Sequence, residues 1–206
     1  MKKQTEARDV KLKILEAARK LFSEVGYEGT SVRQICEEAG VALALVSYHF
    51  GGKENVFYAL VDTYFTQDII PEPVEEPVLE LKRFVEKQSR FFLSNQDLMR
   101  IFQQEVMMNS PRLEKMIPLI MCLRRNLRVI LEAGVKQGVF EIDTMDDTCR
   151  FIINLMALPK IQQIAILTNI PLNPPEEQVV NVVRFIFRGI GYKQDVYEAY
   201  PAEQSG

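Results

Sequence analysis

The sequence has 206 residues, of which 47% are hydrophobic and 26% are charged. This composition is typical of a globular protein and excludes a disordered or fibrous chain, and the length excludes a large multidomain machine. The net charge of -3 argues against a protein that coats nucleic acid, because non-specific affinity comes from neutralising phosphates. The first twenty residues nevertheless hold seven Lys or Arg against three acids. We therefore expect any nucleic acid to meet the N-terminal end.

The N-terminal segment MKKQTEARDV is charged and lacks the apolar core of a signal peptide. No apolar run reaches the roughly 18 residues that a membrane-spanning helix needs. These features predict a cytoplasmic protein that does not enter a membrane. The cysteines Cys36, Cys122 and Cys149 lie in apolar helical patterns without metal-ligand spacing. Core positions are therefore favoured over a redox sensor, and no metal or cofactor is expected.

Apolar residues recur with the period of an α-helix from end to end, and no segment has the pattern of a strand. The sequence therefore predicts an all-α fold. Its N-terminal part should form four helices, at residues 9–25, 31–39, 43–49 and from about Lys53 onward. Gly26 should end the first helix, because glycine readily adopts the backbone conformation found at helix ends.

The second and third of these helices have the features of a helix-turn-helix. Ser31 and Gln34 have the spacing of a capping box, and Gly40 stands where the chain must reverse between two helices. The third helix is poorly capped and has a mixed outer face, with Val46 and Phe50 able to face inward. Such a helix is expected to be presented on the surface.

The same region resembles the tetracycline-repressor (TetR) family of bacterial regulators. The matching residues are Phe22, Gly26 and Tyr27, then Thr30-Ser31-Val32-Arg33-Gln34-Ile35, Ala39-Gly40-Val41 and Tyr48-His49-Phe50-Gly51-Gly52-Lys53-Glu54. The resemblance is close over residues 9–65 and extends further only in length and helix layout. It implies a three-helix DNA-binding domain, a connecting fourth helix, and a C-terminal helical domain that binds a small molecule and dimerises.

The resemblance also implies which side chains meet DNA. The expected phosphate contacts are Thr30, Ser31, Tyr48 and Lys53. Residues near the DNA edge are Arg33 and Gln34, and those facing the bases are Leu43, Ala44 and Ser47. Ala42 and His49 complete the predicted surface. The alternatives are a solvated charge for Lys53 and a packing role for Tyr48 and His49.

The presented helix departs from the family pattern. Residues 42–49 include no Arg, Lys, Asn or Gln, the side chains that make bidentate base contacts. We hypothesise that Leu43 and Ala44 touch thymine methyl groups. The remaining specificity is expected from Arg33, Gln34 and the basic segment between Lys2 and Arg8, partly through DNA shape.

An acidic stretch containing Pro71, Pro73 and Pro77 has the composition of a linker. We place a DNA-binding domain at residues 1–55 and an effector-binding and dimerisation domain at residues 56–206. The second domain should contain five helices, at about 75–94, 96–109, 111–137, 144–168 and 174–190. Ser110 should cap the third of these, and Pro159 should kink the fourth.

Methionine and phenylalanine are frequent in these helices and suit a hydrophobic effector cavity, although ordinary core packing explains them equally well. The predicted pocket residues are Phe91, Met99, Phe102, Glu105, Met108, Met121 and Met156. The last helix is apolar on more than one face, which predicts a dimer unless the helix is buried wholly within its own domain. The predicted interface residues are Phe151, Leu155, Val180, Val183 and Phe187.

The resemblance, taken with the Met- and Phe-rich C-terminal helices, implies a ligand-responsive repressor that binds double-stranded operator DNA as a homodimer and is released by a small hydrophobic effector. An enzyme is not expected, because the single histidine, His49, has no matching nucleophile and carboxylate set. The alternative is a helical protein-interaction module with a degenerate helix-turn-helix, which the apolar Leu43 and Leu45 would suit.

Overall fold

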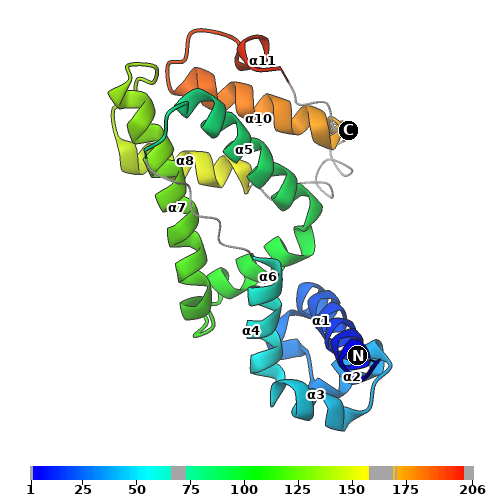
Figure 1. Ribbon diagram of the computed structural model, residues 1–206. Coiled ribbons are helices and arrows are strands. Elements are labelled where there is room, and N and C mark those ends of the chain that lie inside the picture. Colours follow the sequence, from blue (N-terminus) through cyan, green and yellow to red (C-terminus); the bar gives the residue numbers. More distant parts are fainter. Residues whose placement is uncertain (1, 66–72, 158–168, 170, 202–206) are drawn as a thin grey trace. The chain divides into compact units, whose positions relative to one another are not determined.

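The computed structural model describes residues 2–65, 73–157, 169 and 171–201, the first five of them as backbone alone. Within these ranges all regular structure is helical, which confirms the predicted all-α fold (Figure 1). The chain divides into two compact units. The first comprises residues 1–67 and 97–119, and the second comprises residues 68–96 and 120–206.

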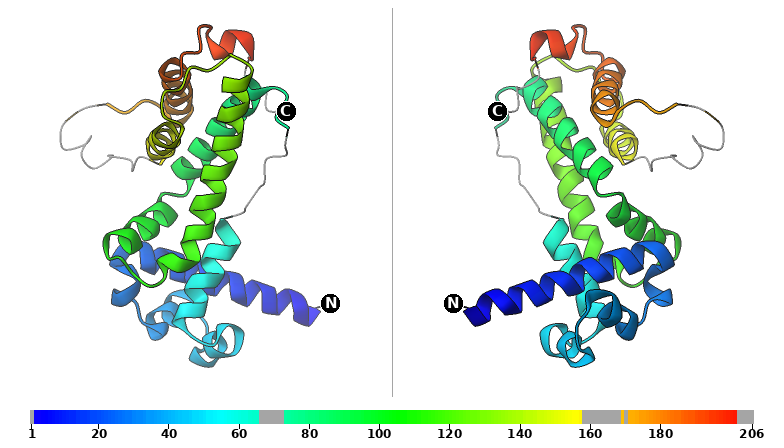
Figure 2. Two further views of the ribbon diagram at one scale, coloured as in Figure 1. Left: turned by 90° about the vertical axis from the view of Figure 1, so that its left-hand side faces the viewer. Right: turned by 90° about the vertical axis from the view of Figure 1, so that its right-hand side faces the viewer.

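The first unit is built around α1 and three shorter helices. These are α1 (Lys2–Gly29), α2 (Val32–Ala39), α3 (Leu43–Phe50) and α4 (Lys53–Tyr64), joined by most of α6 (Gln96–Met107) and the start of α7 (Leu113–Lys136). The apolar face of α1 buries Ile14, Ala18 and Phe22. α1 packs on α2 and α4, and its N-terminal turns extend past them (Figure 2).

α1 is longer than predicted at both ends. Gly26 has φ 78° and ψ 168°, so the backbone leaves the helical conformation there as predicted, and a further turn runs to Gly29. At the other end the helix begins at Lys2, before the apolar periodicity on which the prediction rested. The charged residues at the N-terminal end of α1 have sufficient helical propensity to extend the helix, which packing stabilises from Ile14 onward.

The predicted domain boundary between residues 55 and 56 falls inside α4. This helix buries Val56, Phe57, Leu60 and Val61, and it packs on α1 and α3. All of α4 therefore belongs to the first compact unit. The division of the chain into a DNA-binding part and an effector-binding part remains a prediction.

The second unit surrounds one hydrophobic core. Its helices are α5 (Pro77–Ser94), the remainder of α7, α8 (Met145–Met156), α10 (Pro175–Gly189) and the short α11 (Val196–Ala199). α10 packs on α5, α8 contacts both, and α8 and α10 run side by side (Figure 2). The fully buried residues of this core include Leu81, Val85, Leu127, Ile130 and Val183.

Several predicted features of the second part need adjustment. Ser110 does not cap α7, which begins at Leu113; its hydroxyl donates to Glu105 instead. α8 ends at Met156, and Pro159 lies outside the described residues. α11 was not predicted, because a single turn is too short to show a helical period.

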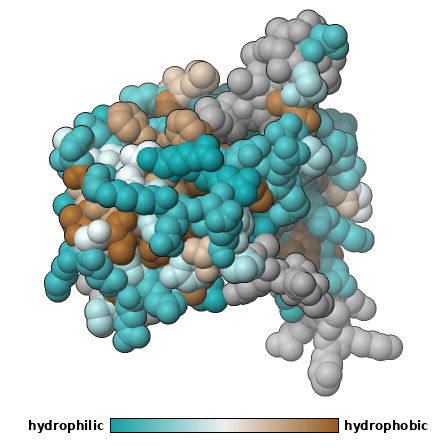
Figure 3. All heavy atoms as spheres, turned by 90° about the horizontal axis from the view of Figure 1, so that it is seen from above, coloured by the Kyte–Doolittle hydropathy of each residue, from teal (hydrophilic) through white to brown (hydrophobic). Residues whose placement is uncertain are grey.

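One face of the molecule can be judged from its hydropathy. The face drawn in Figure 3 is mostly hydrophilic, with hydrophobic residues in small patches. Over the residues that the structure describes, no helix has the length and apolar character that a membrane crossing requires. In the same residues, no three His, Cys, Asp or Glu side chains gather as a metal site would need.

Candidate DNA interface

α2 begins with the capping box that the sequence predicts. The backbone N–H of Gln34 donates to Ser31 Oγ at 3.2 Å, and the N–H of Ser31 donates to Gln34 Oε1 at 2.7 Å. α2 ends at Gly40, which has φ 65° and donates its N–H to the carbonyls of Cys36 and Glu37. Both ends of α2 are therefore fixed by local hydrogen bonds, which sets the start of the turn into α3.

α3 is buried on one side and presented on the other. Val46 is fully buried, and Ala42 precedes the helix without a side-chain cap, as predicted. Leu43 is 56% exposed and Tyr48 is 81% exposed, and Ala44 and Ser47 are also exposed. An exposed row with a packed back is the arrangement that a recognition helix needs in order to enter a DNA groove.

Replacing Ser31 with alanine should lower the free energy of unfolding by about 1 kcal/mol, because the amide of Gln34 loses its cap. Urea denaturation without DNA measures this loss. Ser47→Ala is the matched control: Ser47 is exposed within α3, and its substitution should change stability by less than about 0.5 kcal/mol. An equal loss at both positions would contradict the capping role.

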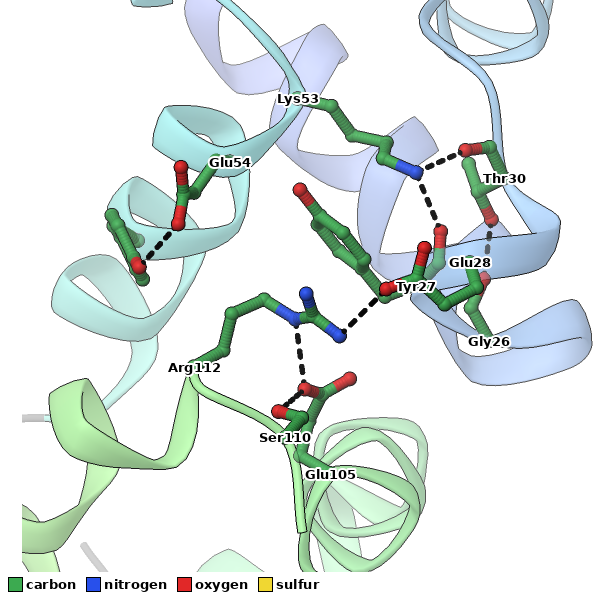
Figure 4. Close-up of polar contacts among 10 residues, drawn as sticks. Gly26, Tyr27, Glu28, Thr30, Lys53, Glu54, Glu105, Ser110 and Arg112 are labelled. Carbon is green, nitrogen blue, oxygen red and sulfur yellow. Dashed lines mark hydrogen bonds and ion pairs between the residues drawn. The ribbon is translucent and has the colours of Figure 1, made fainter. Parts of the chain in front are cut away.

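Lys53 lies at the start of α4, where it was predicted to hold a phosphate. Its Nζ donates to the backbone carbonyl of Tyr27 at 2.9 Å and to that of Thr30 at 2.8 Å (Figure 4). The ammonium therefore ties the end of α1 to the start of α4. Since an ammonium has three donors, these two hydrogen bonds leave one N–H of Lys53 unused.

The Thr30 side chain has a different role from the predicted one. Thr30 is 1% exposed, and its hydroxyl donates to the carbonyl of Gly26 at 2.8 Å. The hydroxyl therefore links Thr30 to Gly26, the residue at which α1 breaks. It is not exposed for contact with a phosphate. Its expected phosphate contact is therefore corrected to a structural one.

The remaining predicted DNA contacts are solvent-accessible. Arg33 is exposed and pairs with Glu37 one turn along α2, with Nε and Oε1 2.9 Å apart. The Tyr48 ring stacks edge-on against half-buried His49, with 4.9 Å between ring centroids. Exposed basic side chains on α1 add positive charge to the same unit; these are Arg8, Lys11 and Lys13.

Two of the three thiols are poorly placed for redox chemistry. Cys36 and Cys149 are buried, which confirms the sequence interpretation, and burial raises the pKa of both thiols. Because the thiolate is the reactive form, a raised pKa lowers reactivity at neutral pH. Cys122 is half-buried.

The predicted effector residues are divided between the two units. Met99, Phe102, Glu105 and Met108 belong to the first, and Phe91, Met121 and Met156 belong to the second. Met99 and Met156 are buried, whereas Met108 and Met121 are exposed. Glu105 is buried and bound by Ser110 and Arg112, so the expected contact of its carboxylate with a ligand is corrected to an internal ion pair.

The predicted dimer residues also divide. Val183 and Phe187 are buried in the core of their own unit and cannot present a surface to a partner. Phe151 is 65% exposed, and Leu155 and Val180 are half-buried. An additional exposed aromatic, Phe185 on α10, was missed because an apolar pattern on several faces does not reveal which face the chain itself covers.

A capped helix, a glycine turn and a presented second helix define a helix-turn-helix DNA-binding protein. Residues 14–60 match bacterial regulatory proteins of the tetR family, and residues 75–158 match a tetracyclin repressor-like C-terminal domain. The chain belongs to the TetR family of bacterial regulators.

Several relatives are similar over most of the chain. A linker-substituted mutant of HlyIIR, a hemolysin II transcriptional regulator, has 30% identity and a TM-score of 0.75 over 91% of this chain and 100% of its own. PfmR of Thermus thermophilus has 30% identity and a TM-score of 0.63 over 88% and 99%. The probable regulator YttP of Bacillus subtilis is 24% identical over 85% of this chain and 93% of its own.

The transcriptional repressor AcnR of Corynebacterium glutamicum is more similar over a shorter stretch. It is 51% identical over 47 residues, which are 23% of this chain and 25% of AcnR. The match thus spans a quarter of that repressor's length.

Proposed function

We propose that this chain is a ligand-responsive transcriptional repressor that binds operator DNA through α3 and the start of α2. The single observation that supports this most strongly is the exposed face of α3 on a buried back, next to a fully capped α2. The name of AcnR as a repressor supports repression over activation.

The first unit offers more hydrogen-bond donors for phosphates than for base edges. Tyr48 and the remaining N–H of Lys53 are available to phosphates, whereas the exposed side of α3 offers Leu43 and Ala44 for contact with thymine methyl groups. Ser31 is exposed, but its hydroxyl donates to Gln34 Oε1 at 2.8 Å and would have to exchange that bond to reach a phosphate. Arg33 is free to turn toward a base, because an exposed ion pair such as its pair with Glu37 contributes only about 0 to 1 kcal/mol.

Dimerisation through α8 and α10 would bring two such units to one operator. Between these helices lies an apolar hollow of about 400 Å³, with Phe151 and Phe185 at the surface. Its other lining residues are Thr148, Ile152, Asn154, Leu155, Ile186, Gly189 and Ile190. A second copy would cover the two aromatic rings, which supports a four-helix interface formed by α8 and α10 of both chains.

Replacing Phe185 with aspartate should convert the dimer into a monomer, because the interface would then bury an unpaired carboxylate. Light scattering after gel filtration should give twice the 23.7 kDa chain mass for the wild type and that mass for the variant. Met107→Asp, at a position 87% exposed in the first unit, should remain dimeric. A dimeric Phe185→Asp variant would contradict the assigned interface.

A polar anchor in the second unit supports an internal effector. In the part of the chain that the structure describes, the Ser89 hydroxyl on α5 is buried without a hydrogen-bond partner. Val85, one turn earlier, belongs to the core, and Phe92 packs against it. Because buried hydroxyls are normally paired, a largely apolar effector with one hydrogen-bonding group suits this position.

DNA binding is tested by letting the wild-type protein select duplexes from a pool of random sequences. Recovery of one recurring sequence, bound more weakly as salt rises, is the expected result. Failure to enrich any duplex would contradict the proposal and favour a helical protein-interaction module, for which the exposed Leu43 is the supporting feature.

A thermal-shift screen with lipophilic alcohols, ketones and carboxylic acids tests the effector. At least one compound should raise Tm and lower affinity for the selected duplex, and Ser89→Ala should reduce the Tm shift. If no compound in the panel changed Tm, the internal effector site would be contradicted.

A further inference from the structure

The turn between α6 and α7 contributes a buried ion pair to the first unit. Arg112 Nε donates to Glu105 Oε2 at 2.8 Å, and the Ser110 hydroxyl donates to the same oxygen. The side chains of Arg112 and Glu105 are 10% and 5% exposed. A buried pair of this kind fixes geometry, because each charge depends on its partner in a medium of low dielectric.

The Arg112 guanidinium also covers the ring of Tyr27. Its Cζ lies 3.6 Å from the ring centroid, and Lys53 Nζ lies 4.1 Å from the same centroid. Figure 4 shows the ring between the two cations. Both contacts are cation–π interactions, which are stronger where the cation is withdrawn from water. Glu28 accepts a further bond from Arg112 at 3.2 Å.

Tyr27 connects this cluster to the start of α2. Lys53 binds the carbonyls of Tyr27 and Thr30, and Thr30 directly precedes Ser31, the cap of α2. The Tyr27 ring packs on Phe57 of α4, with centroids 5.7 Å apart. A movement of Arg112 would thus change the support of the residues that enter α2.

We propose that Arg112 is a positioning residue for DNA binding, acting through Tyr27 and Lys53 on the start of α2. In the described part of the chain its side chain contacts Glu28, Tyr27 and Glu105, none of which is proposed to face DNA. It lies 59 positions beyond Lys53 in the sequence. Its effect is to hold the donors of α2 and α4 in one arrangement before DNA arrives. This inference rests on the proposed function, because DNA affinity is one of the quantities that test it.

The test uses a double variant, Glu105→Gln with Arg112→Met, which removes both charges and so leaves no unpaired buried carboxylate. The probe is the duplex that the wild type selects from a random pool. Affinity should fall by about tenfold, the equivalent of one or two lost cation–π contacts. The slope of log affinity against log salt should stay unchanged, because Arg112 neutralises no phosphate.

Amide hydrogen exchange separates positioning from general stability. In the double variant, exchange should become faster at residues 30–36 and stay unchanged in α10 of the second unit. Tyr27→Phe keeps the ring and should bind like the wild type, whereas Tyr27→Leu removes the ring and should reproduce the loss. The leucine variant also serves if the double variant fails to fold.

Wild-type affinity and exchange in the double variant, or in Tyr27→Leu, would overturn the assignment. A salt slope smaller by about one would overturn it differently, by making Arg112 a direct phosphate ligand. Hydrogen exchange needs no DNA, so unchanged protection at residues 30–36 in the variants would refute the positioning role even if the wild type selects no duplex. Failure of the wild type to select a duplex would refute only the proposed function.

Discussion

A glutamate in place of Ala44 should weaken binding to the selected duplex by about a hundredfold or more, since like charges brought together at an interface cost several kcal/mol. Ala44 is exposed on α3 between Leu43 and Ser47, so its side chain would face the phosphates and base edges. A dimer would carry this penalty twice. Fluorescence anisotropy with the labelled duplex at fixed salt measures the loss.

Stability should be unaffected by the same change, because Ala44 is exposed and glutamate is a good helix former. Ala44→Gln, which has nearly the same shape without the charge, is the matched control and should lose far less affinity. If Ala44→Glu bound as tightly as the wild type, α3 would not be the helix that approaches DNA.

Replacing Gly134 with alanine should destabilise the second unit by about 3 kcal/mol, the upper end of the usual cost of overpacking. A Cβ at this position would lie 1.9 Å from Cδ2 of the buried Phe140 ring. The ring approaches so closely because the chain folds back after α7. The N–H of Phe140 donates to the carbonyl of Gly134 at 3.3 Å, and Gly138 makes the reversal with φ 72°.

The same substitution on a Phe140→Leu background isolates the cause. The smaller side chain should relieve the clash, so that Gly134→Ala then costs less than about 1 kcal/mol in urea denaturation. An equal cost on both backgrounds would show that the loss does not come from contact with the ring.

The helix-turn-helix could be predicted from the sequence because its determinants are local. The capping box joins Ser31 to Gln34, and Gly40 adopts the positive φ that the turn requires. Interactions that span three or four residues leave a direct mark on spacing. The exposed face of α3 follows from the same local pattern.

Roles set by distant residues could not be predicted in this way. Lys53 binds carbonyls more than twenty positions earlier, and Arg112 meets Glu28 across 84 positions. Nothing in the spacing of these residues indicates such partners. Likewise, α10 is apolar on several faces, and only tertiary packing shows that Val183 lies inside while Phe185 lies outside.

Sequence-specific DNA binding by the first compact unit is tested most directly by comparing two duplexes at one salt concentration. One is the duplex that the wild type selects, and the other has the same bases in shuffled order. The selected duplex should bind at least about a thousandfold more tightly, the lower end of the range for specific regulators. Equal affinity for both duplexes, or no measurable binding to either, would contradict the assignment of this chain as an operator-binding regulator.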